Sequence, residues 1–126
     1  MGGELADGWF IAPTVFGDVD HGSDLARNEV FGPVQSILRF SSEDEARALA
    51  NDNPYGLPAY LHTADPARIE RFVRELDAGT VAVNGPGRMS PATPFRGTKQ
   101  SGFGREGGRA GIEEMVQTKT VFVDAG

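Results

Sequence analysis

The sequence predicts an α/β fold built on a parallel sheet, because segments with helical periodicity alternate with short runs rich in β-branched residues. Two well-marked helices lie between three such runs, which gives the order βαβαβ. Parallel strands need long crossover connections, and these are usually helices. A chain of 126 residues also has the size of one ordinary domain.

The first half of the chain predicts an irregular strand, a regular strand and a helix. The apolar run Trp9–Val19 is β-prone, but Pro13 restricts it to an edge or an irregular strand. Val34–Phe40 has the composition of a strand. Ser42–Glu45 matches a capping box, apolar residues follow at helical spacing, and the pair Asn53-Pro54 ends that helix.

The second half begins with a strand, a helix and a strand. Strands are predicted at Pro58–His62 and Thr80–Asn84. Between them Asp65 caps a helix, Pro66 takes its first position and Gly79 ends it. The apolar face of this helix is formed by Ile69, Phe72, Val73 and Leu76.

The rest of the chain predicts a long loop, a helix and a strand. Gly85–Arg105 carries little predicted structure, and loops of that length are usually functional or disordered. Ile112, Met115 and Val116 mark a final helix. Thr120–Val123 is short and β-prone and predicts a final strand.

The composition excludes several classes of protein. Twelve basic and 18 acidic residues give a net charge of −6, which disfavours binding to nucleic acid. No segment is apolar for long enough to span a bilayer, and Met1–Ala6 lacks the features of a secretory signal. We therefore expect a cytoplasmic protein without membrane contact. The chain has no cysteine, which excludes disulfides and thiolate metal sites.

Two motifs have alternative interpretations that we weigh and do not favour. Gly102–Gly107 matches G-x-G-x-x-G, but the polar segment Arg96–Ser101 precedes it where a dinucleotide site needs a strand, so a backbone-packing loop before a helix is preferred. Three acidic residues match positions 1, 3 and 12 of a calcium loop: Asp18, Asp20 and Glu29. Ser23 stands where that loop needs glycine, and His21 and His62 lack ligand-spaced partners, so we predict no metal site and two surface histidines.

The sequence offers no catalytic residue of its own. Ser101 has Lys99 nearby, yet no G-x-S-x-G elbow occurs, so both residues are predicted to organise the loop. Glu29 lies in a stretch confined by Phe31 and Pro33, where an ionised carboxylate could accept hydrogen bonds from two neighbouring ribose hydroxyls.

A series of motifs, taken in order, resembles the C-terminal part of the aldehyde dehydrogenase superfamily. The motifs are Pro13-Thr14-Val15-Phe16, Glu29-x-Phe31-Gly32-Pro33-Val34, Tyr55-Gly56-Leu57, Ala78-Gly79-Thr80-Val81, Val83-Asn84, Pro94-Phe95, Gly97-x-Lys99-x-Ser101-Gly102-x-Gly104-Arg105-Glu106 and Lys119-Thr120-Val121. The resemblance implies that residues 1–126 form the C-terminal part of a three-layer catalytic domain. Residues 119–126 would be an oligomerisation strand, and the Rossmann domain would be absent.

The resemblance also implies roles for four residues. In that family a cysteine thiolate attacks an aldehyde, hydride passes to NAD or NADP, and a glutamate-activated water releases the acid. Glu29 would bind the nicotinamide ribose and Phe31 would pack beside the nicotinamide, while Met89 and Phe95 would line the aldehyde channel. The segments that carry the cysteine, the general-base glutamate and the dinucleotide loop have no counterpart in this sequence.

The sequence departs from the family pattern at three positions. Asn28 stands where a second acidic residue is usual, and Pro58 and Arg96 stand where small residues are usual. Arg96 directly follows the channel residue Phe95, so it bears on the geometry of the substrate mouth.

Two hypotheses follow. In the first, the chain is the C-terminal part of an NAD(P)-dependent aldehyde dehydrogenase, a truncation product, one half of a split protein or a remnant, inactive and without bound cofactor by itself. A companion chain would then carry the Rossmann and cysteine segments. In the second, it is a non-catalytic interaction module that associates with itself, or with a full-length relative, through the C-terminal strand.

Overall fold

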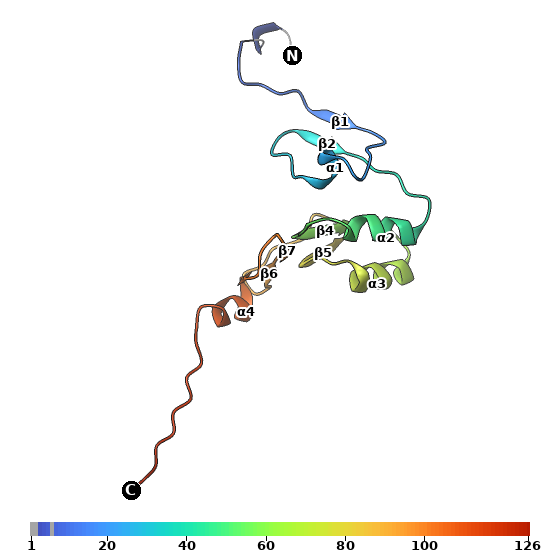
Figure 1. The fold of residues 1–126 in the computed structure, drawn as a ribbon. Helices are drawn as coiled ribbons and strands as arrows, with labels where there is room; N and C mark the ends of the chain where they lie inside the picture. The colour runs from blue at the N-terminus through green and yellow to red at the C-terminus, as the bar shows by residue number, and fades with distance from the viewer. Residues whose placement is uncertain (1–2, 6) are drawn as a thin grey trace. The chain divides into compact units, whose positions relative to one another are not determined.

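The computed structural model describes residues 3–5 and 7–126 (Figure 1). The chain has two units, 1–53 and 54–126, and each is described by itself. The N-terminal stretch, judged above to lack a secretory signal, includes residues 1, 2 and 6, which lie outside the described residues. Among the helices that are described, none is long and apolar enough to cross a membrane.

The first unit pairs two short strands in parallel. Its elements in order are η1 (Gly3–Leu5), β1 (Thr14–Phe16), α1 (Asp24–Arg27), β2 (Val34–Ser36) and α2 (Glu43–Asn51). In the β1–β2 pair, Thr14 lies opposite Val34 and Phe16 lies opposite Ser36. β1 is a short strand directly after Pro13, as predicted, and β2 ends at Ser36 rather than at Phe40.

The capping prediction for α2 is confirmed. The Ser42 hydroxyl accepts a hydrogen bond from the Glu45 backbone N–H at 3.2 Å. In return the Glu45 carboxylate accepts one from the Ser41 backbone N–H at 2.6 Å. These bonds satisfy N–H groups that the start of a helix leaves without intrahelical partners.

The second unit contains the predicted strand–helix–strand. β4 (Pro58–Leu61), α3 (Pro66–Glu75) and β5 (Thr80–Val83) form a parallel βαβ unit, in which Pro58 lies opposite Thr80. The Asp65 carboxylate caps α3 by accepting hydrogen bonds from the N–H groups of the two residues after Pro66. Phe72 of α3 and Ala82 of β5 are the buried apolar side chains of the described residues, so these two elements contribute the core of the second unit.

Gly79 does not end α3, and that prediction is wrong. The helix ends at Glu75, and Leu76 is already extended. Gly79 instead donates its N–H to the Gly56 carbonyl at 3.0 Å and lies against the Arg96 backbone, where a Cβ would collide. Its lack of a side chain therefore serves a close approach of two chain segments.

The segment predicted as a long loop with little structure contains three short strands, which corrects that prediction. These are β6 (Phe95–Arg96), β7 (Thr98–Lys99) and β8 (Arg105–Glu106), while β3 (Tyr55–Gly56) precedes β4. β3 pairs with β7, and β6 pairs with β8, both antiparallel. Each strand has two residues, which is too short for a side-chain alternation to be read from sequence.

The predicted order βαβαβ is confirmed as β2, α2, β4, α3 and β5, although the sheet is divided into two-stranded pieces. The α/β class and the parallel pairing are as predicted.

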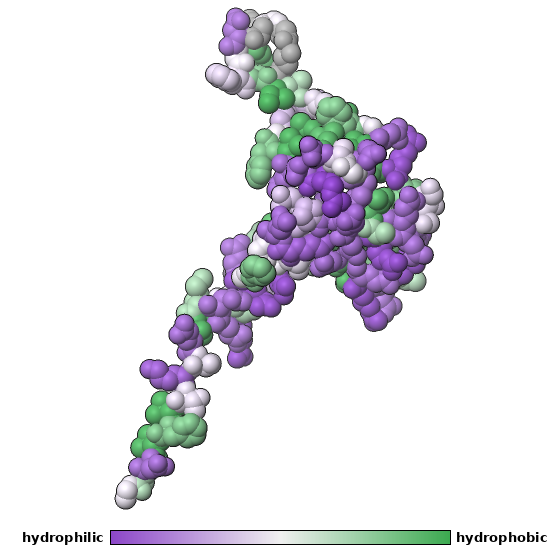
Figure 2. Space-filling model, in the orientation of Figure 1, coloured by the Kyte–Doolittle hydropathy of each residue, from purple (hydrophilic) through white to green (hydrophobic). Residues whose placement is uncertain are grey.

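The end of the chain corrects two further predictions. α4 (Gly108–Glu113) ends before Met115 and Val116, which were expected on it. Thr120–Val123 is not a strand, because no described segment pairs with its backbone, and a strand exists only through such pairing. Val121, Phe122 and Val123 are exposed, and hydrophobic side chains appear along this tail in Figure 2.

Candidate functional site

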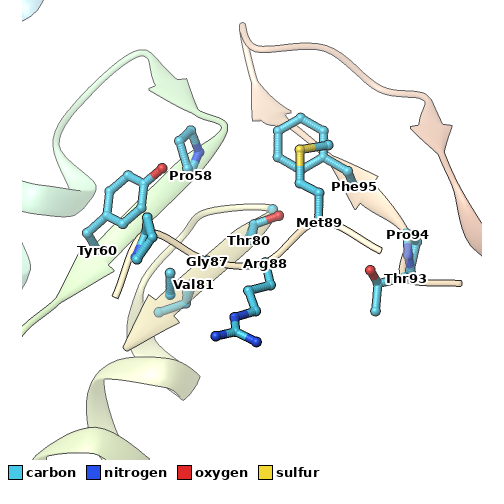
Figure 3. Close-up of a pocket in the computed structure, with 13 residues that line it drawn as sticks. Pro58, Tyr60, Thr80, Val81, Gly87, Arg88, Met89, Thr93, Pro94 and Phe95 are labelled. Atoms are coloured by element: carbon cyan, nitrogen blue, oxygen red, sulfur yellow. The ribbon is translucent and has the colours of Figure 1, made fainter. Parts of the chain in front are cut away.

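A pocket of about 450 Å³ lies in the second unit (Figure 3). It is formed by β4, β5, the segment that leaves β5, and the chain leading into β6. Its lining residues are Pro58, Tyr60, Gly79, Thr80, Val81, Ala82, Pro86, Gly87, Arg88, Met89, Thr93, Pro94 and Phe95. The two residues predicted to line a channel, Met89 and Phe95, thus line the same pocket.

Asn84 fixes the point at which the chain leaves β5 for the pocket. Its backbone N–H donates to the Leu61 carbonyl at 2.8 Å, which continues the β4–β5 ladder. Its side-chain amide then accepts from the Thr63 N–H and donates to the Thr63 carbonyl, both at 2.9 Å. The residue has a φ of 55°, in the left-handed region that asparagine tolerates better than most residues. The chain therefore turns at Asn84 as it leaves β5.

The opposite wall of the pocket is held by backbone contacts with the start of α4. The Gly108 N–H donates to the Pro91 carbonyl at 2.7 Å. Gly107 and Gly108 have φ values of 75° and 58°, and a Cβ at either would meet the carbonyl of Thr93 or Ala92 at 2.7 or 2.8 Å. Glycines are required here for a close approach. This is the backbone-packing loop before a helix that the sequence favoured over a dinucleotide site.

Lys99 and Ser101 organise the loop, as predicted. The Ser101 hydroxyl accepts a hydrogen bond from the Gly56 N–H at 3.1 Å, across 45 residues of sequence. The Lys99 ammonium lies 3.4 Å from the Asp77 carboxylate, and Lys99 itself has a φ of 53°. Both side chains connect the β7 turn to other segments of the second unit.

The pocket wall is mainly apolar, with a few polar groups. The hydroxyl-bearing side chains are Tyr60, Thr80 and Thr93. Arg88 is the one charged residue of the thirteen that line the pocket, all of which are described. A concave apolar surface with few polar groups is the usual form of a small-molecule site.

Glu29 and Phe31, the predicted cofactor-binding residues, lie in the first unit between α1 and β2. Both side chains are exposed, and that of Phe31 is 93% exposed. They neighbour each other in sequence and belong to a different unit from Met89 and Phe95.

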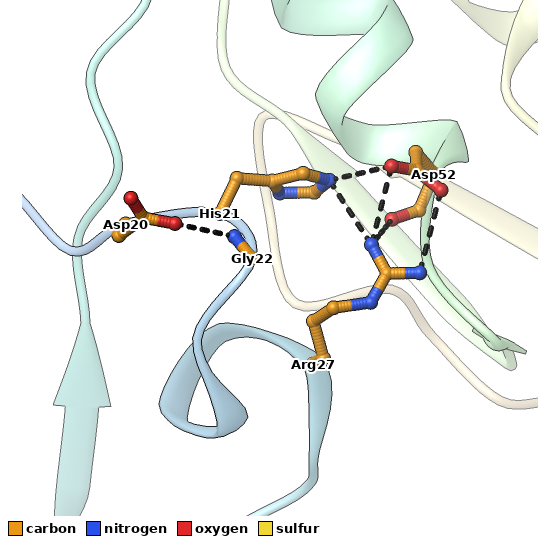
Figure 4. A network of polar contacts seen from close by, with 5 residues as sticks. All are labelled: Asp20, His21, Gly22, Arg27 and Asp52. Atoms are coloured by element: carbon orange, nitrogen blue, oxygen red, sulfur yellow. Dashed lines mark hydrogen bonds and ion pairs between the residues drawn. The ribbon is translucent and has the colours of Figure 1, made fainter.

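A polar network in the first unit was not found from the sequence (Figure 4). The Arg27 guanidinium donates to the Asp52 carboxylate at 3.2 Å and to its backbone carbonyl at 3.1 Å. The His21 Nε2 lies 2.9 Å from the Asp52 carboxylate and 3.3 Å from Arg27, so its tautomer decides which of the two it bonds. The Arg27 hydrogen bond, followed by that of His21, holds the pKa of the Asp52 carboxyl below its ordinary value.

His21 was predicted to be a surface residue rather than a metal ligand, and its side chain is 25% exposed within this network. The partners lie 31 and 6 residues away in sequence, which no local pattern connects. Two of the three acidic residues of the calcium-loop alternative also have protein partners. Asp18 pairs with Arg39, and the Asp20 carboxylate accepts the Gly22 N–H at 2.7 Å.

Comparison with known proteins identifies the family. The sequence profile of the aldehyde dehydrogenase family matches residues 1–121. The chain belongs to the aldehyde dehydrogenase family.

Its relatives are longer proteins. A betaine aldehyde dehydrogenase of Cereibacter sphaeroides is 46% identical over 127 aligned residues, which cover 99% of this chain and 26% of that relative. A Mycobacterium tuberculosis aldehyde dehydrogenase complexed with NAD+ superposes with a TM-score of 0.89 at 39% identity, covering 98% of this chain and 26% of that one. A 3,6-anhydro-L-galactose dehydrogenase in complex with NAP gives a TM-score of 0.90 at 33% identity, with the same coverage. The chain therefore spans about a quarter of the length of these aldehyde dehydrogenases.

Two departures from the family pattern lie at or beside the pocket. Pro58 lines it from the first position of β4. The Arg96 side chain is half-buried and its Nε donates to the Gly97 carbonyl at 3.3 Å. Arg96 is not a lining residue, so its charge is held against the loop backbone rather than presented to the pocket wall.

Proposed function

We propose that this chain supplies the aldehyde-channel wall and the nicotinamide-ribose contact of an NAD(P)-dependent aldehyde dehydrogenase, and that it does not oxidise aldehydes by itself. The observation that carries the proposal is a family match over residues 1–121 together with a pocket that Met89 and Phe95 both line. The sequence has no cysteine, so this chain offers no thiolate for the covalent step.

Each of the four predicted site residues has a role in this proposal. Met89 and Phe95 would line the path of the aldehyde, because both present apolar surface to the pocket. Glu29 would accept hydrogen bonds from the nicotinamide ribose, and Phe31 would pack beside the nicotinamide. Their exposure supports this, because such groups must be open to a ligand.

The test is a pair of assays with aldehydes that differ in size and charge. The purified chain, freed of host dehydrogenases, should reduce no NAD+ or NADP+. A chimera in which this chain replaces the matching quarter of the Cereibacter sphaeroides betaine aldehyde dehydrogenase should reduce NAD+. Turnover by the chain alone would contradict the first part of the proposal, and a folded but inactive chimera would contradict the second.

Cofactor binding gives a further test. A hydrogen bond to a charged group contributes about 1.5–3 kcal/mol, which does not offset the several kcal/mol lost when two molecules associate. We therefore expect calorimetry to detect no micromolar binding of NAD+ to the chain. In the chimera, Glu29→Gln should raise the KM for NAD+ about tenfold, whereas Glu70→Gln on the exposed face of α3 should not.

A second candidate function is association, and the exposed C-terminal segment favours it. Val121, Phe122 and Val123 are 69%, 90% and 85% exposed, in an extended stretch with no strand partner in the described chain. Unpaired backbone and contiguous apolar surface both recruit another chain. We propose that this segment pairs with a second copy of the chain, with a full-length relative, or with a companion chain bearing the Rossmann and cysteine segments, in the cytoplasm.

Light scattering distinguishes these cases. The purified chain should form a dimer or larger species, and deletion of Thr120–Gly126 should return it to a monomer. A monomer at high micromolar concentration would contradict self-association. An oligomer of unchanged size after the deletion would show that the C-terminal segment is not part of the contact.

A further inference from the structure

The pocket of the second unit carries one positive charge and no negative one. Arg88 is the one charged residue among the thirteen described lining residues, and none of them is an aspartate or a glutamate. The chain as a whole has a net charge of −6, so a positive wall here is not a consequence of its composition. No ion pair or hydrogen bond of the Arg88 side chain is found within the described part of the chain.

The Arg88 guanidinium and the apolar lining side chains lie in different parts of the pocket. Arg88 leaves the same short segment as Met89, but Figure 3 shows its guanidinium pointing away from the Phe95 ring. Phe95 and Met89 lie at one end of the view, and Tyr60 and Pro58 lie across from them. A ligand whose apolar part lies between these groups would therefore need a charged end that extends beyond them to reach Arg88.

We infer that this pocket selects aldehydes that carry an anionic group, and that Arg88 is the residue that sets this selectivity. The inference rests on the proposed function, because it assigns a substrate class to the proposed aldehyde channel. A guanidinium binds a carboxylate through two parallel N–H···O bonds, which fixes the orientation of the ligand as well as its charge. A carboxylate or phosphate at the end of the aldehyde remote from its carbonyl would be recognised in this way.

The same geometry disfavours a cationic aldehyde. Betaine aldehyde carries a quaternary ammonium group, and relatives of this chain are betaine aldehyde dehydrogenases. Aromatic rings such as Tyr60 and Phe95 can hold such a cation or an uncharged chain. The deciding group is Arg88, which repels a cation and attracts an anion. The substrate class of this chain is thus inferred to differ from that of those relatives.

The direct test measures binding to the chain itself and needs no catalysis. Its methionines are labelled with ¹³C in the methyl group. The chain is titrated with three probes that have short apolar chains and differ in charge: butyrate, butyramide and butyltrimethylammonium. The Met89 signal reports the pocket, and the Met115 signal, outside the pocket, is the internal control. An exposed ion pair changes affinity by up to about fivefold, and a bidentate one by more.

We expect butyrate to bind at least about threefold more tightly than butyramide, and butyltrimethylammonium to bind least. Arg88→Gln should abolish the preference, and Arg88→Glu should invert it. Arg109→Gln is the matched control, because it removes the same charge from α4 outside the pocket. Equal binding of the three probes, no shift of Met89 with any of them, or a preference that survives Arg88→Gln would overturn the inference.

The chimera then separates this inference from the proposed function. An active chimera should have a higher kcat/KM for 4-oxobutanoate than for betaine aldehyde. Arg88→Gln should reverse that order, whereas the control Arg109→Gln should leave it unchanged. An active chimera without this discrimination contradicts the inference and leaves the proposed function standing. An inactive chimera contradicts the proposed function, and the probe titration still decides the charge selectivity.

Discussion

Asn84 provides a quantitative test of how the pocket-lining segment is held. Replacing it with glycine keeps the left-handed turn but removes two side-chain hydrogen bonds to Thr63, each 2.9 Å long. Each bond contributes about 0.5–1.5 kcal/mol, and at this exposed site we expect a total loss of about 1–2 kcal/mol. Replacing it with alanine removes the same bonds and adds a left-handed strain of about 1 kcal/mol. The native protein should be the most stable, the Asn84→Gly variant less stable, and the Asn84→Ala variant the least stable.

The assay is amide hydrogen exchange of Thr63, whose N–H the Asn84 side chain accepts, together with urea unfolding of each variant. A loss of 1.4 kcal/mol should speed exchange about tenfold where exchange follows local opening. Asn28 is the matched control, because it has an extended φ of −111° and alanine there should cost no more than glycine. An alanine variant at Asn84 as stable as the glycine variant would refute the strain argument. Unchanged Thr63 exchange in the glycine variant would refute the hydrogen-bond argument.

Three other predictions concern stability. Gly79→Ala should destabilise the second unit strongly, because the new Cβ collides with the backbone carbonyl of Arg96. Gly85→Ala is the control, because a Cβ there has no neighbouring atom within 4 Å. Thermal unfolding compares the stability of the two variants. Asp52→Asn should destabilise the first unit at neutral pH. The Arg27 hydrogen bond lowers the pKa of Asp52 in the folded protein. The stability that ionised Asp52 contributes is therefore complete above its ordinary pKa of about 3.9, and it is lost as pH falls through the lower folded pKa. The stabilities of the native protein and the Asp52→Asn variant should thus converge in acid unfolding curves. Asp65→Ala should cost about 1 kcal/mol in urea unfolding through loss of the α3 cap.

The helices that the sequence predicted well are those with chemical start signals. Asp65 with the following proline, and Ser42 with Glu45, specify their helix starts through local bonds that any context preserves. The parallel pairing of β4 and β5 follows from the helix between them, because a crossover of that length returns the chain in the same direction. These features depend on residues within a few positions of one another.

The features that the sequence did not predict depend on residues far apart in the chain. The β3–β7 pair joins residues more than 40 positions apart, and the Ser101 bond to Gly56 spans 45. The network of His21, Arg27 and Asp52 likewise connects separate elements. Short pairings of this kind have no periodicity, so a single sequence carries no signal for them. The Cβ clash at Gly79 is visible only once its neighbour is in place.

The wrong strand prediction at Thr120–Val123 has a different cause, because β-propensity alone does not form a strand. A β-prone segment becomes a strand only when another backbone shares hydrogen bonds with it, and no described strand pairs with this segment. The same reasoning applies to Phe31, an aromatic side chain that is almost fully exposed. Burial of such groups is favoured by about 25 cal/mol per Å² of apolar surface, so their exposure marks surfaces where contact with ligand or protein is most favourable. The exposed groups of Phe31, Phe122 and Met89 are accordingly assigned to the proposed cofactor contact, the proposed association segment and the proposed channel.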